Sequence, residues 1–197
     1  DRVDLHILAC LARPEWLDAA IASVEGQARV QVVEGERGHI GRSRARALAM
    51  GTAEFVAWVD DDDLLEPGAV ARCVQYLDDH PDVISVYSDV IVIDEDGAEL
   101  QRTNKPPWSP IRQLTRVGEW HHFHMARRSC VEAVLPFTKD WSCGCEEFVL
   151  GGELVRFGPH HHIPEPLYRW RQKTGPSALR TITREGWSRA IKQVTPT

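Results

Sequence analysis

The stretch Phe55-Val56-Ala57-Trp58-Val59-Asp60-Asp61-Asp62-Asp63 decides both the fold class and the position of the site. Its five apolar residues predict a buried strand, and four consecutive acids follow directly. Adjacent carboxylates repel one another, and a bound cation relieves that repulsion. Mg²⁺ and Mn²⁺ prefer oxygen ligands, so the run predicts a metal site at a strand end. The alternative is an acidic loop or a helix N-cap, with Asp63 capping a helix around 64–67.

Strands and helices alternate through the first half of the chain. Apolar runs at 3–10, 30–33, 55–59 and 83–93 predict strands, and helical spacing predicts helices that begin near Arg13, Arg42 and Pro67. This order favours an α/β fold with a mostly parallel sheet flanked by helices. Ligands of such sheets bind at the carboxyl ends of strands, where Glu34 and the acidic run both fall. Further on, we expect a strand within 117–127, a helix over 146–157, and a loop and strand over 164–170.

Length and composition suggest a single domain over 1–197. No apolar run is long enough to span a membrane, and the five cysteines lack the spacing of a disulfide framework. We therefore expect a cytoplasmic protein. The net charge of −6 argues against general nucleic-acid binding, but residues 165–197 carry seven basic and two acidic side chains. This basic tail predicts an anionic partner, and a solvated basic helix is the alternative.

The segment 55–68 resembles the Asp-x-Asp segment of GT-A fold, family 2-like inverting glycosyltransferases. Further segments resemble the family in the same order: 13–17 (Arg-Pro-Glu-Trp-Leu), 32–35 (Val-Val-Glu-Gly), 44–47 (Arg-Ala-Arg-Ala), 144–150 (Gly-Cys-Glu-Glu-Phe-Val-Leu) and 163–169 (Ile-Pro-Glu-Pro-Leu-Tyr-Arg). The chain departs from the family at 45–47, where an Asn and a Gly are replaced. Elsewhere Glu stands for Asp at positions 34 and 147.

The resemblance implies a Rossmann-like GT-A fold and an enzyme of hexosyltransferase type, which transfers a sugar from a nucleotide-sugar to an acceptor hydroxyl. It favours a UDP-sugar as the donor. It assigns the nucleotide-sugar to residues 1–103 and the acceptor to 104–197, with Mn²⁺ or Mg²⁺ as cofactor. Glu34 would contact the base, and Asp60 the ribose or donor sugar. Asp60 and Asp62 would bind the metal, with Asp61 beside them at the donor. Arg44 would lie near the nucleotide, unless it is an ordinary surface arginine.

By the same resemblance, Glu147 is the catalytic base. Inverting transfer needs one carboxylate that takes the proton of the acceptor hydroxyl as it attacks. Glu146 would orient the acceptor or pair with an arginine. The alternative is that both acids only favour the start of a helix. Arg171 falls where the family often has a histidine, and an arginine there would hold phosphate rather than metal.

His122, His124 and Trp141 are expected on the acceptor side. On an extended strand the two histidines would share one face, and the tryptophan could stack on a sugar ring. Core packing explains such residues equally well. The clusters 121–124 and 160–162, even with Cys143 and Cys145, match no standard zinc spacing.

The acceptor stays open between a saccharide, a small molecule, a lipid-linked sugar and modified DNA. A metal-dependent nucleotidyltransferase is one rival, but it would carry a Gly-rich basic loop after the first strand, and residues 9–13 are not one. A noncatalytic sugar-binding or metal-binding module is another. Such a relative would be expected to lose the metal acid or the base, whereas Asp62 and Glu147 are both carboxylates.

Overall fold

One mixed sheet runs through the molecule, in a computed structural model that describes residues 2–10, 13–36, 39–115, 120, 122–141, 145–173 and 184–194. The strands are β1 (Val3–Ala9), β2 (Arg29–Glu34), β3 (Phe55–Asp60), β4 (Leu64–Leu65), β5 (Ser85–Ile93), β6 (Glu99–Thr103), β7 (His124–Arg127) and β8 (His160–Arg171). Their order is β2-β1-β3-β7-β5-β8-β4, and β6 pairs with β5. The predicted strands at 3–10, 30–33, 55–59 and 83–93 are confirmed.

Five of these strands run in one direction. β1 is parallel to β2 and β3, and β5 is parallel to β8. The short strand β7 lies antiparallel between β3 and β5, so it gives both parallel groups the same direction. Only β4, β6 and β7 run the other way. The prediction of a mostly parallel sheet is therefore confirmed, and the carboxyl ends of β1, β2 and β3 lie at one edge.

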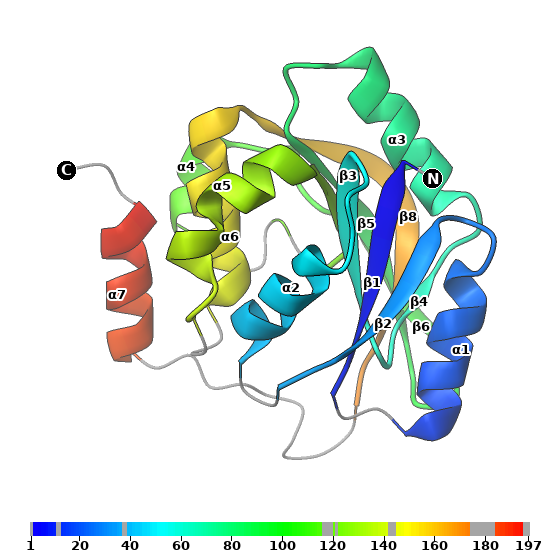
Figure 1. Cartoon of the computed structure of the whole chain (residues 1–197). Helices are drawn as coiled ribbons and strands as arrows, with labels where there is room; N and C mark the ends of the chain where they lie inside the picture. The colour runs from blue at the N-terminus through cyan, green and yellow to red at the C-terminus, as the bar shows by residue number, and fades with distance from the viewer. Residues whose placement is uncertain are drawn as a thin grey trace.

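Helices cover both faces of the sheet (Figure 1). On one face α1 (Pro14–Val24) and α3 (Ala69–Asp79) pack against one buried apolar cluster. On the other face α2 (Ile40–Ala49), α5 (Arg128–Thr138) and α6 (Glu146–Leu154) pack against a second cluster. Two further helices are short, α4 (Pro110–Thr115) and η1 (Val155–Phe157). The predicted helices near Arg13, Arg42 and Pro67 correspond to α1, α2 and α3.

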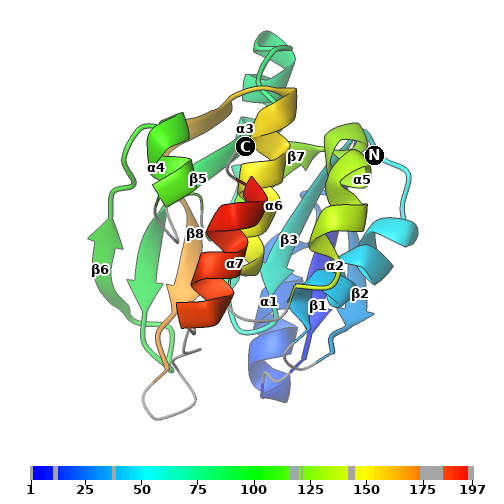
Figure 2. The same ribbon diagram turned by 90° about the vertical axis from the view of Figure 1, so that its left-hand side faces the viewer.

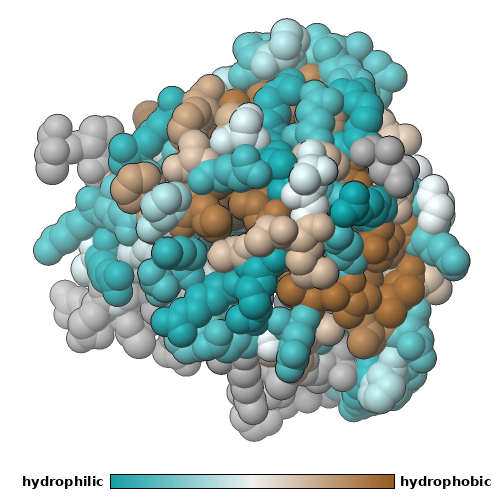
Figure 3. Space-filling view, viewed as in Figure 1, coloured by the Kyte–Doolittle hydropathy of each residue, from teal (hydrophilic) through white to brown (hydrophobic). Residues whose placement is uncertain are grey.

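The basic tail contains a helix, α7 (Arg184–Val194), that packs on α6 (Figure 2). Its Ala190 and Val194 are buried in a third apolar cluster with Phe148 and Val149 of α6. The tail is therefore partly folded against the body. Within the described residues, no helix has the length and apolar character needed to cross a membrane. Figure 3 shows a largely hydrophilic face, with a hydrophobic area near β2 and α1.

Three predicted boundaries differ from the structure. The strand expected within 117–127 is only β7, and the strand expected after a loop at 164–170 belongs to the longer β8. The helix considered around 64–67 is wrong, since Leu64–Leu65 form the strand β4 against β8. The helix α5 was not predicted, because Pro136 lies inside it and obscures the apolar spacing.

Candidate functional site

The register of the sheet brings the predicted donor residues to one edge. Ala9 lies opposite Glu34 across β1 and β2, and Leu8 lies opposite Asp60 across β1 and β3. Glu34 is exposed at the end of β2, and Arg46 of α2 donates a 2.9 Å hydrogen bond to its backbone carbonyl. Glu34 and the acidic run thus lie at the same edge of the sheet, at the carboxyl ends of β2 and β3, with β1 between them.

The four acids differ in burial and in partners. Asp60 is half-buried, whereas Asp61, Asp62 and Asp63 are only 7%, 9% and 1% exposed. Asp61 Oδ2 accepts a 2.5 Å hydrogen bond from the backbone N–H of Cys10, directly after β1. This bond ties the run to the first loop, so Asp61 shapes the backbone of the edge.

Asp63 anchors the run to β8. It accepts hydrogen bonds from the Tyr168 hydroxyl at 2.9 Å and from the Arg171 backbone N–H at 2.7 Å. Burial raises the pKa of Asp63 well above its ordinary value, and the charges of Asp60 and Asp62 raise it further. Asp63 therefore does not cap a helix. It holds the acidic run against the last strand of the sheet.

Arg171 is buried and holds backbone groups around the site. Its Nε donates to the carbonyl of Asp62 at 2.8 Å, and Nη1 donates to the carbonyls of Asp94 and Glu95 at 3.0 and 2.8 Å. Its guanidinium carbon lies 5.1 Å from the centroid of the Trp16 ring. These bonds fix the backbone of the acidic run and of the segment after β5. Arg171 therefore acts on this edge of the sheet by holding its backbone in place.

Lys173 supplies a cation that the sequence reasoning did not single out. Its Nζ forms an ion pair with Asp62 Oδ2, and the two side chains are 31% and 12% exposed. Burial alone would lower the pKa of Lys173, but its bond to Asp62 and the charges of Asp61 and Asp63 raise it above its ordinary value. Lys173 lies two positions after Arg171. Because residues two apart in an extended chain lie on the same face, this spacing was the signal that could have identified it.

A candidate metal group forms beside the run. One ligand atom each of Asp60, Asp63 and His122 lie within 4.8 Å of one another. Carboxylate oxygens suit Mn²⁺ and Mg²⁺, and imidazole adds a donor that Mn²⁺ tolerates better than Mg²⁺. The donor set therefore fits a divalent cation. The sequence paired Asp60 with Asp62, whereas this group joins Asp60 to Asp63 and to His122 from the second half of the chain.

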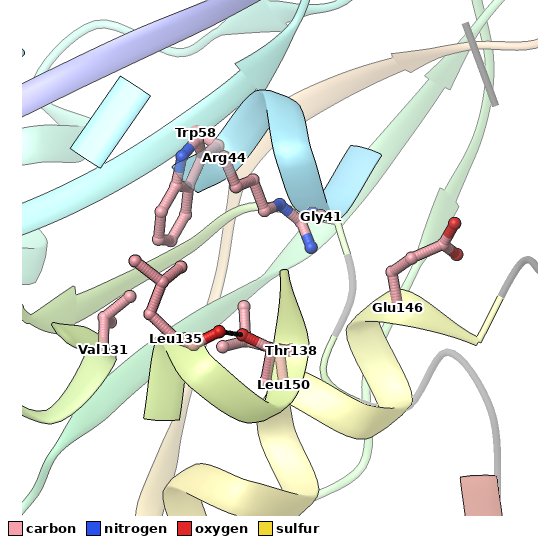
Figure 4. Close-up of a pocket in the computed structure, with 8 residues that line it drawn as sticks. All are labelled: Gly41, Arg44, Trp58, Val131, Leu135, Thr138, Glu146 and Leu150. Carbon is pink, nitrogen blue, oxygen red and sulfur yellow. Dashed lines mark hydrogen bonds between the residues drawn. The ribbon is translucent and has the colours of Figure 1, made fainter. Parts of the chain in front are cut away.

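Glu147, the expected catalytic base, lies at the start of α6, opposite α2. Arg44 Nη2 donates a 2.5 Å hydrogen bond to Glu147 Oε1, and the two side chains are 10% and 13% exposed. The neighbouring Glu146 is buried and lines a pocket whose empty volume of about 310 Å³ includes open solvent. Figure 4 shows Arg44 between Trp58 and Glu146 in this pocket. Arg44, predicted near the nucleotide, and Glu147, predicted at the acceptor hydroxyl, thus contact each other.

The acceptor-side aromatic residues separate in the structure. His122 stacks on Trp170 with centroids 5.1 Å apart, near the acidic run. His124 is buried on the other face of the sheet, where it stacks on Trp120 at 3.9 Å. The expectation that His122 and His124 share a face is wrong, because β7 begins only at His124. Trp141 is buried between α6 and α7, with Arg189 over its ring at 4.5 Å.

The other histidine cluster bonds to protein groups. Nδ1 of His160 lies 2.5 Å from the hydroxyl of Ser85, and its Nε2 lies 3.0 Å from the carbonyl of Gly151. His162 pairs with Asp89 at 2.7 Å. Burial lowers the pKa of His160 to about 4. These contacts give the cluster a structural role, and Cys143 of the zinc hypothesis lies outside the described residues.

Most of the chain aligns with known proteins. Residues 14–135 match the sequence profile of the family described as "Glycosyl transferase family 2". Uncharacterized protein y4gI of Sinorhizobium fredii is 30% identical over 154 residues, which are 76% of this chain and 17% of y4gI. O-antigen biosynthesis protein RfbC of Myxococcus xanthus is 27% identical over 181 residues, which are 84% of this chain and 14% of RfbC. The chain spans less than a fifth of the length of either relative.

A solved structure shares the fold. The crystal structure of S. aureus TarS 1–349 in complex with UDP-GlcNAc has a TM-score of 0.70 and 11% sequence identity to this chain. The match covers 98% of this chain and 65% of the TarS chain. At this identity the match is evidence for the fold, and it agrees with the expected mixed sheet flanked by helices.

Proposed function

Because the chain belongs to glycosyl transferase family 2, we propose that it transfers a sugar from a nucleotide-sugar, a UDP-sugar, to an acceptor hydroxyl with inversion. The observation that carries the proposal is the convergence of Glu34 and the acidic run at the carboxyl ends of β2 and β3. The crystal structure with the same fold is of a complex with UDP-GlcNAc, which supports the choice of UDP.

We assign the donor site to the edge that β1, β2 and β3 share with the end of β8. Glu34 contacts the nucleotide base, and Asp60 the ribose or the sugar. Asp60 and Asp62 hold a divalent cation, Mn²⁺ or Mg²⁺, and His122 lies close enough to Asp60 and Asp63 to add a ligand. The cation, when bound, stabilises the charge of the departing diphosphate. Arg171 supports this site by holding the backbone of Asp62.

Glu147 is the proposed base of a single displacement. The acceptor oxygen forms a bond to the anomeric carbon while the bond from that carbon to the diphosphate breaks. The electron pair leaves with the diphosphate, and the acceptor proton goes to the Glu147 carboxylate. Arg44 positions that carboxylate through the 2.5 Å hydrogen bond, and Glu146 faces the neighbouring pocket.

The acceptor is proposed to be a saccharide. RfbC, named for O-antigen biosynthesis, is 27% identical over 84% of this chain, which supports that class over a small molecule or modified DNA. The proposed division into a donor half, 1–103, and an acceptor half, 104–197, needs one refinement. Tyr168, Arg171 and Lys173 of the second half contact the acidic run of the first.

A donor-hydrolysis screen tests the proposal. The chain is incubated with UDP-, GDP- and TDP-sugars and Mn²⁺, and nucleotide release is measured for wild type, Asp62→Ala and Glu147→Gln. We expect release from UDP-sugars only, strongly reduced in Asp62→Ala, and transfer to added acceptor lost in Glu147→Gln. Exposed Asp18→Ala and Glu25→Gln are matched controls with wild-type rates. Wild-type turnover in Asp62→Ala would remove the metal assignment, and intact transfer in Glu147→Gln would remove the base.

A further inference from the structure

We propose that Lys173 is a tethered counter-cation that competes with the divalent metal for Asp62 and turns to the donor diphosphate once the metal displaces it. Lys173 then links metal binding to donor binding. This inference rests on the proposed function, since it takes Asp62 as a metal ligand. It goes further by giving the basic residue after β8 a role in deciding when the metal binds.

The position of the ammonium group supports the competition. Lys173 Nζ pairs with Asp62 Oδ2, which is the kind of oxygen that a hard divalent cation takes. The Asp62 side chain is only 12% exposed, and its backbone carbonyl is held by Arg171. The carboxylate therefore has little room to serve a lysine on one side and a metal on the other. When a cation binds this carboxylate, the ammonium has to leave.

The chemistry of the lysine supports the second half of the proposal. Arg171 is 5% exposed, and its Nε and Nη1 donate to three backbone carbonyls, so moving it would break several bonds. Lys173 is 31% exposed and ends in a compact charge on a flexible four-carbon stem. A displaced lysine of this kind can follow a phosphate group over several ångströms. It is therefore the movable cation of the pair.

The surroundings provide a place for an anion. Lys173 Nζ lies 5.8 Å from the centroid of the Trp16 ring, and the guanidinium carbons of Arg13 and Arg171 lie 4.5 and 5.1 Å from the same ring. Three cationic side chains thus lie around one aromatic ring next to the acidic run, and Arg13 is also paired with Glu95 at 2.9 Å. A donor brings two negative phosphates to this edge, and these would stabilise the ammonium after it leaves Asp62.

Metal binding without nucleotide is the first test. Mn²⁺ is titrated into wild type, Lys173→Met and Lys173→Gln, and free Mn²⁺ is followed by electron paramagnetic resonance. We expect Mn²⁺ to bind the two variants about tenfold more tightly, because the competing charge is gone. Lys192→Met, which removes an exposed lysine on α7, is the matched control and keeps the wild-type affinity. Unchanged Mn²⁺ affinity in both Lys173 variants would overturn the inference.

Nucleotide binding at saturating Mn²⁺, where the metal has displaced Lys173 from Asp62, is the second test. UDP affinity of the same proteins is measured by calorimetry, and we expect about a fivefold loss in the Lys173 variants because the diphosphate loses a cationic partner. Unchanged UDP affinity would overturn the second half of the proposal. Asp62→Asn separates a failure of the proposed metal site from a failure of the role given to Lys173. If Asp62→Asn does not weaken Mn²⁺ binding, the proposed metal site fails; if it does and the Lys173 variants match wild type, only the present inference fails.

Discussion

The contact between Arg44 and Glu147 yields a prediction that can be worked out from the structure. The two side chains are 10% and 13% exposed and come from α2 and α6, 103 residues apart in the sequence. Replacing Arg44 by Met keeps most of the apolar stem and removes the guanidinium. Glu147 is then left largely buried without its charge partner, which costs far more than breaking an exposed pair.

The magnitude follows from this burial. Truncating one partner of a fully buried pair costs about 3–5 kcal/mol, and an exposed pair contributes at most about 1 kcal/mol. Because about a tenth of each side chain is exposed, we expect Arg44→Met to lower the free energy of unfolding by about 3 kcal/mol. For a chain of this size that corresponds to a fall in Tm of roughly 6–12 °C. Arg42→Met on the same helix is the control, with an expected loss of about 0.5 kcal/mol or less, since Arg42 is exposed.

A double-mutant cycle isolates the pair. Arg44→Met, Glu147→Gln and the double variant are unfolded in urea at equilibrium, and the free energies are compared at constant m-value. The double variant buries no isolated charge, so its loss should be smaller than the sum of the single losses by about 2 kcal/mol. Additivity within about 0.5 kcal/mol would refute the reasoning. So would an Arg44→Met protein that loses less than about 1 kcal/mol.

Kinetics distinguish the two roles considered for Arg44. If Arg44 positions Glu147, Arg44→Lys lowers kcat and leaves the KM for the donor near its wild-type value. If Arg44 contacts the nucleotide instead, the KM for the donor rises. Arg42→Met serves again as the control for a change of charge on α2.

Three further predictions concern residues that support the fold around the site through buried hydrogen bonds or close packing. Asp63→Ala should lower the free energy of unfolding by about 3 kcal/mol in urea, because Tyr168 and the Arg171 N–H lose their buried acceptor; a loss below 1 kcal/mol would contradict this role. Burial lowers the pKa of His160 to about 4, so the unfolded chain binds the proton first as pH falls. Its stabilising contribution, up to about 3 kcal/mol, is complete above pH 6.5 and is lost from pH 6.5 toward pH 4, and His160→Gln should show a smaller fall between pH 7 and 5 than wild type. Gly41→Ala would place a Cβ 2.7 Å from the backbone oxygens of Thr138 and Lys139, so α2 and α5 must separate. We expect a loss of about 2 kcal/mol by urea unfolding, whereas Ala49→Ser at an exposed position of α2 should change little.

The acidic run and its strand could be predicted because their signal is local. Five consecutive apolar residues predict β3 from the sequence alone, and the parallel order of β1, β2 and β3 brings Glu34 to the same edge. The partners of the run could not be predicted in this way. Lys173 meets Asp62 only because β8 pairs with β4 and with β5, and that register depends on contacts between distant segments.

The remaining differences have one local cause and one long-range cause. His122 and His124 were expected on one face because an extended strand alternates, but β7 is too short to include both. Arg44 and Glu147 were each predicted at the site. Their contact requires α2 and α6 to lie on the same face of the sheet, and a single sequence carries no direct signal for that.

The place of β5 has a consequence for any attempt to cut the protein in two. This strand belongs to the first half of the chain, yet β7 and β8, which flank it in the sheet, both come from the second half. A fragment that stops at Thr103 would leave β5 with only the β6 hairpin and an exposed row of unpaired backbone groups, which is a template for aggregation. The two halves of the chain are thus inseparable as folding units, and binding to either half has to be measured with the whole sheet present.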